Sequence, residues 1–311
     1  MSRNTPLQQH DIHKLAGKYA LTEVGFEPIE GGANSSYALH THQGDYVLTV
    51  FDEKSWADVV KIGQLLLLLA DCEFPTTRLV PPTKGGLATM YRDKPVMLKE
   101  YIVGHVFKDL DKTMVSQVGV AMARLHQVPA PDFLPDKHPY GLQVFSRVID
   151  RNINPTYESW LAEQLAYLAR SIPSHLPRGL IHGDMFYDNV LFEGRELRAI
   201  IDFEEACHYY GVFDLGMGIV GLCADETTIA LDRARALVNG YQQVKCIEER
   251  EKEALQLFVE YAATATSYWR FWAYQIYTPT ARKANKYRQM VGLAEEVRAI
   301  PKERFLEAIF D

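Results

Sequence analysis

The hydrophobic periodicity of this chain changes near Gly104. Between Phe26 and Phe51, apolar and polar residues alternate as they do in strands, and a hairpin turn is expected at Gln43 to Asp45. A second hairpin, with its turn at "RDKP", is expected between Gly85 and Gly104. After Gly104 the apolar residues recur at helical spacing. The change of period predicts an α+β chain whose first third is rich in strands and whose remainder is mostly helical.

The apolar pattern also locates the expected helices. The first, Ser55 to Asp71, begins at a serine that can cap it and carries its leucines at helical spacing. Others are marked by Met114 to Leu125 and by Trp160 to Leu168, and long helices are expected beyond Thr227. We therefore divide the chain into an N-terminal lobe with an antiparallel sheet and a helix, a hinge and a larger helical C-terminal lobe, at residues 1–98, 99–104 and 105–311.

Composition excludes several classes of protein. Of the 311 residues, 47% are hydrophobic and 23% are charged, as in a globular chain that can bury a large core. The net charge of -7 lacks the basic footprint of a protein that binds nucleic-acid phosphates, so no nucleic-acid partner is expected. The cysteines have no zinc-ligand spacing, and we expect reduced, mostly buried thiols at Cys72, Cys207, Cys223 and Cys246.

No stretch of the sequence predicts export or a membrane span. The polar N-terminus lacks the apolar core of a signal peptide. The run "LLLLLA" at Leu65 to Ala70 is far too short to cross about 30 Å of hydrocarbon, and the segment Leu255 to Tyr277 carries Glu260 and Arg270. We interpret both as buried helices and expect a cytoplasmic protein with no membrane partner.

A polar loop interrupts the apolar run at Leu180 to Phe192, which reads "LIHGDMFYDNVLF". The flanking "LI" and "VLF" are strand-like, so the loop between them is expected to be anchored at both ends. A further strand, "LRAII", leads into Asp202, and this layout brings Asp184, Asn189 and Asp202 to one edge of a sheet. Such oxygen-bearing side chains suit magnesium, which takes one or two carboxylates together with substrate phosphates. One aspartate is then free to accept a hydroxyl proton.

The spacing of these residues matches the protein-kinase pattern H-R-D-L-x-x-x-N followed by D-F-G. Here "HGDMFYDN" and "DFE" keep the His, the Asp and the Asn at matching spacing, but they replace Arg by Gly and the final Gly by Glu204. The pattern predicts phosphoryl transfer, which asks a protein for positioning and charge neutralisation and not for covalent chemistry. No Walker A sequence ending in Gly-Lys-Ser/Thr occurs in the chain.

From Leu176 to Cys223, the sequence "LPRGLIHGDMFYDNVLFEGRELRAIIDFEEAC…FDLG" resembles the kinase-like aminoglycoside and choline phosphotransferases, and within them the bacterial type II homoserine kinases. The likeness is weak between Pro129 and Pro173. It implies a bilobal protein-kinase-like fold with the active site between the lobes, ATP as donor and Mg²⁺ as metal. It also implies a role for each of five residues: a base at Asp184, magnesium ligands at Asn189 and Asp202, a brace of the catalytic loop at Asp214 and a structural hydrogen-bonding residue at His182.

By the same resemblance, "GGANSSY" is the loop over the phosphates, and the segment Lys99 to Ile102 is the hinge whose backbone meets adenine. Where protein kinases carry a phosphate-binding Lys on strand three, this chain has Thr49. Lys54 and Lys61 are candidates to replace it, and both are equally interpreted as surface lysines. The residues expected to bind ATP are Gly31, Gly32, Asn34, Ser35, Ser36, Lys99, Glu100, Tyr101 and Ile102.

The expected acceptor is a small-molecule alcohol, with homoserine favoured by the resemblance. Homoserine presents an ammonium and a carboxylate, so a carboxylate and a cation are needed near Asp184, and Glu204, Glu205 and Arg270 are the candidates. Arg270, on an apolar helix, is equally expected to pair with a core Glu. Choline, ethanolamine or another amino alcohol would be favoured by aromatic walls, for which the candidates are Trp269, Phe271, Trp272, Tyr209 and Tyr210.

Because the strand-three Lys is absent, a catalytically silent nucleotide-binding regulator is a hypothesis of another class. The basic stretch Arg282 to Arg288 is interpreted as a solvated helix face and is given no function.

Overall fold

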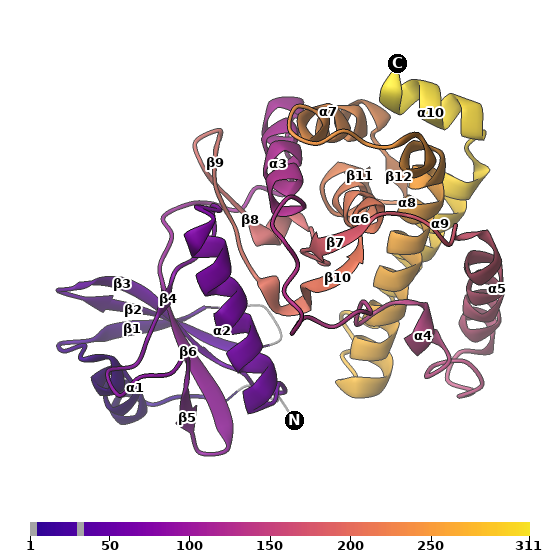
Figure 1. The fold of residues 1–311 in the computed structure, drawn as a ribbon. Coiled ribbons are helices and arrows are strands. Elements are labelled where there is room, and N and C mark those ends of the chain that lie inside the picture. Colours follow the sequence, from indigo (N-terminus) through magenta and orange to yellow (C-terminus); the bar gives the residue numbers. More distant parts are fainter. Residues whose placement is uncertain (1–4, 30–33) are drawn as a thin grey trace. The chain divides into compact units, whose positions relative to one another are not determined.

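The computed structural model describes residues 5–29 and 34–311 (Figure 1). Gly31 and Gly32, two of the residues predicted to bind ATP, lie outside the described residues. The chain divides into two compact units. The first comprises Met1–Gly104 with Arg198–Ile201, and the second comprises His105–Leu197 with Asp202–Asp311.

The first unit is built on an antiparallel sheet with the strand order β1-β2-β3-β6-β4, to which β5 is added by pairing with β6. The two hairpins expected from the alternation are both present: β2 turns into β3 after Thr41, and β5 turns into β6 after Tyr91. The strands are β1 (Gly25–Ile29), β2 (Ser35–Thr41), β3 (Gly44–Val50), β4 (Leu79–Val80), β5 (Thr89–Tyr91) and β6 (Lys94–Glu100).

Two helices cover the sheet, and the alternation of β6 explains how. Val96 and Leu98 belong to the apolar cluster of α1 (Gln9–Ala16), whereas Met97 between them belongs to the cluster of α2 (Trp56–Asp71). Successive side chains of a strand point to opposite faces, so the two helices pack on opposite faces of the sheet. The predicted cap of α2 is confirmed, because the Ser55 hydroxyl accepts the Asp58 N–H at 3.2 Å.

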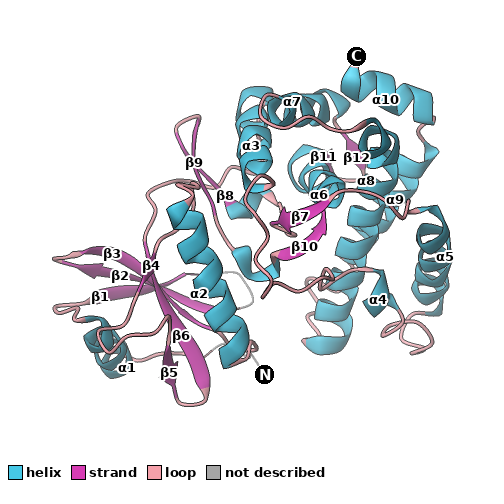
Figure 2. Cartoon of the chain, viewed as in Figure 1, coloured by secondary structure: helices cyan, strands magenta, loops and turns pink. Residues whose placement is uncertain are grey.

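The second unit is mostly helical (Figure 2). Its helices are α3 (Lys112–Leu125), α4 (Leu142–Phe145), α5 (Pro155–Ser171), α6 (Gly211–Cys223), α7 (Leu231–Gln242), α8 (Glu249–Phe271), α9 (Tyr287–Ala299) and α10 (Lys302–Phe310). Short strands pair as β7 (Arg178–Ile181) with β10 (Cys207–Tyr210), β8 (Val190–Glu193) with β9 (Glu196–Ile200), and β11 (Ala224–Asp225) with β12 (Thr228–Ile229). The predicted α+β class is confirmed.

Glycines allow the helices of the second unit to pass very close to other backbone. A Cβ on Gly119 of α3 would lie 2.0 Å from the Leu237 carbonyl oxygen of α7. A Cβ on Gly221 of α6 would lie 2.2 Å from the Met185 carbonyl oxygen, in the loop that follows β7. Neither space holds a methyl group. The buried helix α6 therefore lies directly against the loop that carries Asp184 and Asn189.

The structure corrects two expectations about the end of α8. The segment expected to be one buried helix to Tyr277 leaves the α-helical path at Trp272–Tyr277, a π-helical stretch with no buried residue. The basic stretch is not a helix face, because residues 282–286 form turns and α9 begins only at Tyr287. Pro279 offers no N–H to a continuing helix, which explains why the chain turns here.

The cysteines are all free, but they are not mostly buried. Cys207 and Cys223 are buried within the second unit, whereas Cys72 and Cys246 are exposed. Cys72 caps the C-terminus of α2 and Cys246 lies between α7 and α8, where side chains meet solvent. In the part of the chain that the structure describes, no helix has both the length and the apolar character to cross a membrane.

Candidate active site

The loop between β7 and β8 begins at a strand pair. Ile181, the last residue of β7, lies opposite Cys207 of β10. Gly183 follows with φ at +84°, and a Cβ there would lie 2.6 Å from the Glu205 carbonyl oxygen. Both the backbone angle and the available space therefore require glycine. The loop then passes through a short 3₁₀ turn, Tyr187–Asn189, into β8, so it is anchored at both ends as the sequence predicts.

A buried carboxylate, Asp214 in the first turn of α6, holds the backbone of this loop. Its Oδ2 accepts the His182 N–H at 2.9 Å, and its Oδ1 accepts the Gly183 N–H at 2.8 Å. His126 of α3 donates from Nε2 to the same carboxylate at 3.0 Å, and its Nδ1 is 2.8 Å from the Tyr241 hydroxyl. Burial raises the pKa of Asp214, but hydrogen bonds and the nearby histidines outweigh burial and keep this pKa below its usual value.

Two further histidines tie neighbouring backbone to the loop. The buried His182 accepts the Asp184 N–H at its Nδ1, at 3.2 Å. The buried His138 donates from Nε2 to the Gly183 carbonyl at 2.8 Å and accepts the Tyr140 N–H at Nδ1, at 3.2 Å. Burial lowers the pKa of His138, which favours the neutral ring that both bonds require. The segment that carries Tyr140 is thereby fixed to the loop that carries Asp184.

Asp184 and Asn189 are in direct contact. The Asn189 Nδ2 donates to the Asp184 Oδ2 at 3.1 Å and to the Asp184 carbonyl at 2.8 Å. Burial raises the pKa of Asp184 to about 8, and repulsion from Asp202, Glu205 and Asp188 adds to the shift while Asn189 opposes it. A carboxylate whose pKa lies near neutrality is suited to accept a proton from a hydroxyl group.

Asp202 follows β9 and brings a second carboxylate to this site. Its backbone is left-handed, with φ at 65° and ψ at 66°, a conformation that Asp tolerates better than most residues and that often marks functional sites. The exposed Asp202 carboxylate adds to the raised pKa values of Asp184 and Asp188, and in both cases burial is the larger cause. The loop and the end of β9 therefore place several acids in one small region.

The donor atoms fit a magnesium ion. Both hydrogen bonds of the Asn189 side chain use its nitrogen, which leaves the amide oxygen for a cation, and Asp202 supplies a carboxylate. Over residues 5–29 and 34–311, no group of three His, Cys, Asp or Glu side chains forms a closed metal site. Mg²⁺ commonly takes only one or two protein ligands and completes its octahedral shell with phosphates and water.

On the acidic side of the site, Glu205 lies next to Tyr140. The Tyr140 hydroxyl lies close to the Glu205 carboxylate. Burial is the main cause that raises the pKa of Tyr140, and the charges of Glu205, Asp184 and Asp202 add to it. The Tyr140 ring also packs against Trp269, with centroids 5.9 Å apart. An aromatic wall and a carboxylate thus stand beside Asp184.

The other predicted acceptor residues are distributed more widely. Glu204 is on the same short turn as Glu205 and is partly buried. Among the aromatic candidates, Tyr209 and Phe271 are buried in the core and Trp272 stacks on Tyr277. Trp269, in contrast, packs on Tyr140.

On the basic side, Arg270 belongs to the last turn of α8. Its Nη1 donates to the Gln289 Oε1 at 2.9 Å and to the Lys286 carbonyl at 3.3 Å. The core carboxylate of the same helix, Glu260, pairs with Arg298, so the alternative of a core Glu partner for Arg270 is not realised there. Arg270 and Lys286 both lower the pKa of Asp188, whose burial raises it. Two cations therefore lie close to the acidic loop.

The predicted ATP-binding residues belong to the first unit. Ser35 and Ser36 begin β2, directly after Asn34, and the Ser36 hydroxyl is 3.3 Å from that of Thr49, which is buried on β3. Lys61 is exposed on α2, and Lys54 is partly buried in the segment after β3.

The predicted hinge lies at the end of β6, where Lys99 pairs with Val47. The Glu100 N–H donates to Arg78 and the Tyr101 N–H donates to Asp45, both through backbone carbonyls. Ile102 is partly buried beyond the strand. The amides of Glu100 and Tyr101 are therefore already used within the first unit.

Sequence analysis missed several residues that surround the predicted acids. Asp188 stands inside the motif, and its charge beside Asn189 was a usable signal. Lys286 was hidden in a stretch interpreted as a solvated helix face. Tyr140 lies in the region of weak family likeness, and nothing in its sequence context pointed to the site.

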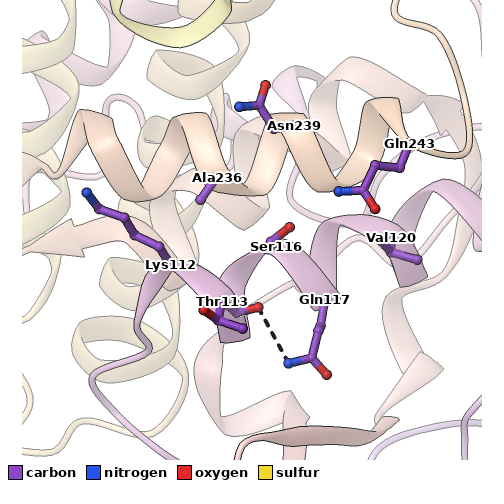
Figure 3. A pocket seen from close by; sticks show the side chains of 8 residues that line it. All are labelled: Lys112, Thr113, Ser116, Gln117, Val120, Ala236, Asn239 and Gln243. Carbon is purple, nitrogen blue, oxygen red and sulfur yellow. Dashed lines mark hydrogen bonds between the residues drawn. The ribbon is translucent and has the colours of Figure 1, made fainter.

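A separate shallow groove of about 440 Å³ runs along α3 and α7 (Figure 3). Its walls carry amides, hydroxyls and one lysine, and none of the predicted acids. Gln117 in this groove bonds the backbone of Arg195 and Leu197, and the Lys112 ammonium pairs with Asp232. These contacts are structural, and the groove is not part of the candidate site.

The family model described as "Phosphotransferase enzyme family" matches residues 25–250. A homoserine kinase of Caulobacter vibrioides is 30% identical over 276 residues, covering 85% of this chain and 86% of that protein. A homoserine kinase of Chelativorans sp. is 33% identical over 248 residues, covering 75% of each chain. These relatives span the motif from Leu180 to Phe192.

Solved structures with the same fold are more distant in sequence. An amicoumacin kinase in complex with AMP-PNP, Ca²⁺ and Ami has a TM-score of 0.76 at 13% identity, covering 96% of both chains. A microcompartment-associated aminopropanol kinase has a TM-score of 0.74 at 16% identity, covering 97% of this chain and all of the other. These similarities confirm the protein-kinase-like fold that the sequence predicts.

Proposed function

Because this chain belongs to the phosphotransferase enzyme family and is a small-molecule kinase, we propose that it transfers the γ-phosphoryl group of ATP to the hydroxyl group of homoserine. The relatives that are 30% and 33% identical to it over the matched residues are homoserine kinases. The observation that carries the proposal is the contact of Asp184 with Asn189 beside Asp202. These residues supply one base and two oxygen ligands, which is the minimum that phosphoryl transfer requires.

Asp184 is the proposed base. The acceptor oxygen forms the new bond to the γ-phosphorus, the bond to the leaving ADP oxygen breaks, and the hydroxyl proton passes to an Asp184 carboxylate oxygen. Asn189 keeps this carboxylate oriented through its 3.1 Å hydrogen bond, and the Asp214 brace fixes the backbone on which both residues stand. Positioning of this kind is the main contribution a protein makes to phosphoryl transfer.

Asn189 and Asp202 are the proposed ligands of Mg²⁺. When bound, this cation would neutralise the negative charge of the transferring phosphoryl group. Asn34, Ser35 and Ser36 are the described residues proposed near the ATP phosphates, and Lys99, Glu100, Tyr101 and Ile102 are proposed near adenine.

The charges around Asp184 favour a zwitterionic acceptor. Glu205, beside Tyr140, is proposed to receive the homoserine ammonium. Arg270 and Lys286, whose charges act on Asp188, are proposed to receive the carboxylate. Glu204 is proposed to assist on the acidic side. An acceptor with both charges would use both sides, whereas an amino alcohol would leave the cations without a ligand carboxylate.

A second candidate is a kinase for choline, ethanolamine or another amino alcohol. The observation in its favour is the aromatic contact between Tyr140 and Trp269 beside Glu205, which suits a cationic head group. A silent regulator is less favoured, because a nucleotide-binding protein without catalysis needs neither the base nor its contact with Asn189.

The deciding experiment measures ATP consumption with homoserine, choline, ethanolamine and 3-aminopropanol, using wild type and Asp184→Asn. Turnover of homoserine that disappears in Asp184→Asn supports the proposal. Turnover of the amino alcohols alone moves the assignment to the second candidate, and ATP binding without any turnover supports a regulator.

Arg270→Met sharpens the acceptor assignment. If Arg270 binds the acceptor carboxylate, this variant raises KM for homoserine and leaves KM for ethanolamine unchanged. Arg298→Met is the matched control, since Arg298 pairs with Glu260 in the same unit and is not proposed to meet the acceptor.

A further inference from the structure

A buried carboxylate organises the start of β2. The Asp52 side chain is 1% exposed, and its Oδ2 accepts both the Ser35 N–H at 2.9 Å and the Ser35 hydroxyl at 2.6 Å. Its Oδ1 accepts the Lys94 ammonium and the Thr5 hydroxyl, each at 2.6 Å. The Asp52 N–H in turn donates to the Asn34 Oδ1 at 3.2 Å. One residue thus fixes both Asn34 and Ser35.

Lys94 compensates the charge of this carboxylate. Burial raises the pKa of Asp52, but hydrogen bonds from Lys94, Ser35 and Thr5 outweigh burial and keep that pKa below its usual value. Asp52 is therefore ionised, and Lys94 is its ion-pair partner. The Lys94 side chain is 28% exposed, so the pair lies at the rim of the sheet and not in its core. Without the ammonium, an uncompensated negative charge would stand beside the residues proposed to meet the ATP phosphates.

The same hydrogen bonds change the role expected for Ser35. Its N–H and its hydroxyl hydrogen are both donated to Asp52, so neither is directed to a phosphate. Ser35 can therefore influence ATP binding only by fixing the position of the backbone. The neighbouring Ser36 and Thr49 are neutral, so no cation of strand β3 takes part in this arrangement.

We propose that Asp52 and Lys94 are positioning residues for ATP in this enzyme. Asp52 fixes the positions of Asn34 and Ser35. Lys94 neutralises the charge of Asp52 and so reduces its repulsion of the anionic phosphates. The proposal rests on the proposed function, because that function places the phosphates beside Asn34. It goes beyond that function by assigning a role to an ion pair between Asp52, just after β3, and Lys94 of β6, which no motif marks.

The test measures ATP affinity by calorimetry without any acceptor, so its result does not depend on the acceptor's identity. Lys94→Met is expected to weaken ATP binding about tenfold, as for the loss of a charged hydrogen bond. Lys94→Arg keeps the charge and is expected to stay within about twofold of wild type. The double variant Asp52→Asn with Lys94→Met removes both charges and is expected to recover most of the affinity. Lys84→Met, at an exposed lysine of the same unit, is the control for net charge.

Kinetics with ATP and homoserine separate positioning from general stability. The proposal expects Lys94→Met to raise KM for ATP and to leave KM for homoserine unchanged. Unchanged ATP affinity in Lys94→Met with a lowered Tm would mean that the pair is only structural, and the proposal would be overturned. A double variant as weak as Lys94→Met would overturn the role of charge compensation. If wild type binds ATP but does not turn over homoserine, the acceptor assignment fails and the positioning role stands or falls on calorimetry alone.

Discussion

Two buried aspartates hold the two functional segments of this protein in different ways. In the second unit, Asp214 accepts the N–H groups of His182 and Gly183 and is paired with His126. In the first unit, Asp52 accepts the N–H and the hydroxyl of Ser35 and is paired with a lysine. In both places a carboxylate with a lowered pKa fixes the backbone beside a proposed substrate group.

The difference lies in how each charge is enclosed. The side chains of Asp214 and His126 are 0% and 1% exposed, so this pair is shielded from solvent and from contact with a bound ligand. The Lys94 side chain is 28% exposed, so the Asp52 pair is open to solvent on one side. A carboxylate that is shielded from solvent fixes the local geometry alone. A carboxylate at the rim of the sheet also exerts an electrostatic effect on a ligand that binds nearby. Asp184 is a third case: within the described residues the structure shows no ion pair to it, and its pKa is raised.

The largest expected effect separates the base from both braces. Asp184→Asn should lower kcat by about 10²- to 10⁴-fold, the usual range for a lost general base. Because the variant also removes a carboxylate that Asp202 and Glu205 repel, its Tm should be equal to or above that of wild type. Steady-state kinetics and thermal unfolding on the same samples check both parts. A large loss of Tm would show that Asp184 is structural and would erase its distinction from Asp214.

The next effect compares the braces directly. Asp214→Asn leaves His126 and two backbone N–H groups facing an amide in a dry site, and it should cost about 3 kcal/mol or more of unfolding free energy. Asp52→Asn leaves a lysine that can turn to solvent, so it should cost about 1 to 2 kcal/mol. Urea unfolding of the two variants measures the difference. Equal losses would mean that enclosure does not distinguish the two sites.

The sequence could predict the first brace but not the second. Asp214 lies in "FDLG", a motif with a known partner loop, and the pattern from His182 to Asp202 has fixed spacing, so the family, the fold and the acidic residues followed from it. Asp52 and Lys94 are separated by about forty positions, and only the register of β3 against β6 brings them together. No local pattern contains that register.

Tertiary packing explains the other gaps as well. Hydrophobic residues that recur every two or every 3.6 positions predicted the hairpins and α2, since these patterns arise from local geometry. Tyr140 reaches the site only because His138 bonds to Gly183, a contact between segments far apart in sequence. Lys286 was misassigned because a run of basic residues does not reveal that the chain turns before α9.

A smaller effect tests how far the catalytic loop depends on the helix beneath it. Gly221→Ala places a methyl group 2.2 Å from the Met185 carbonyl oxygen and must displace the loop or α6. We expect a loss of about 1 to 3 kcal/mol in stability and a reduced kcat with little change in KM for ATP. Gly179→Ala is the matched control, since a Cβ at Gly179 meets nothing within 4 Å. If both variants keep full activity, the loop is less tightly held than the first unit's β2.

The last comparison concerns pH, where braces and base should respond in opposite directions. The lowered pKa values of Asp52 and Asp214 stabilise the folded protein above the ordinary carboxyl pKa of 3.8, and this stabilisation is lost as pH falls through the folded values. Asp184 is the reverse case. Its folded pKa of about 8 exceeds 3.8, so the folded protein binds the extra proton between these values and the free energy of unfolding decreases as pH rises across that window.

A divalent cation should weaken only the second of these trends. Burial is the main cause that raises the pKa of Asp184, and a cation beside Asp202 offsets the repulsion that adds to it, so Mg²⁺ should stabilise the protein more at about pH 8 than at about pH 5. Urea midpoints with EDTA and with Mg²⁺ at both values measure this difference, and Asp184→Asn should reduce it. Because Asp214 and Asp52 are already compensated by His126 and Lys94, the loss of stability at low pH should not respond to the metal. If Mg²⁺ shifts the pH at which that stability is lost, the cation binds at Asp214 or Asp52, and the contrast between enclosed and reactive carboxylates no longer holds.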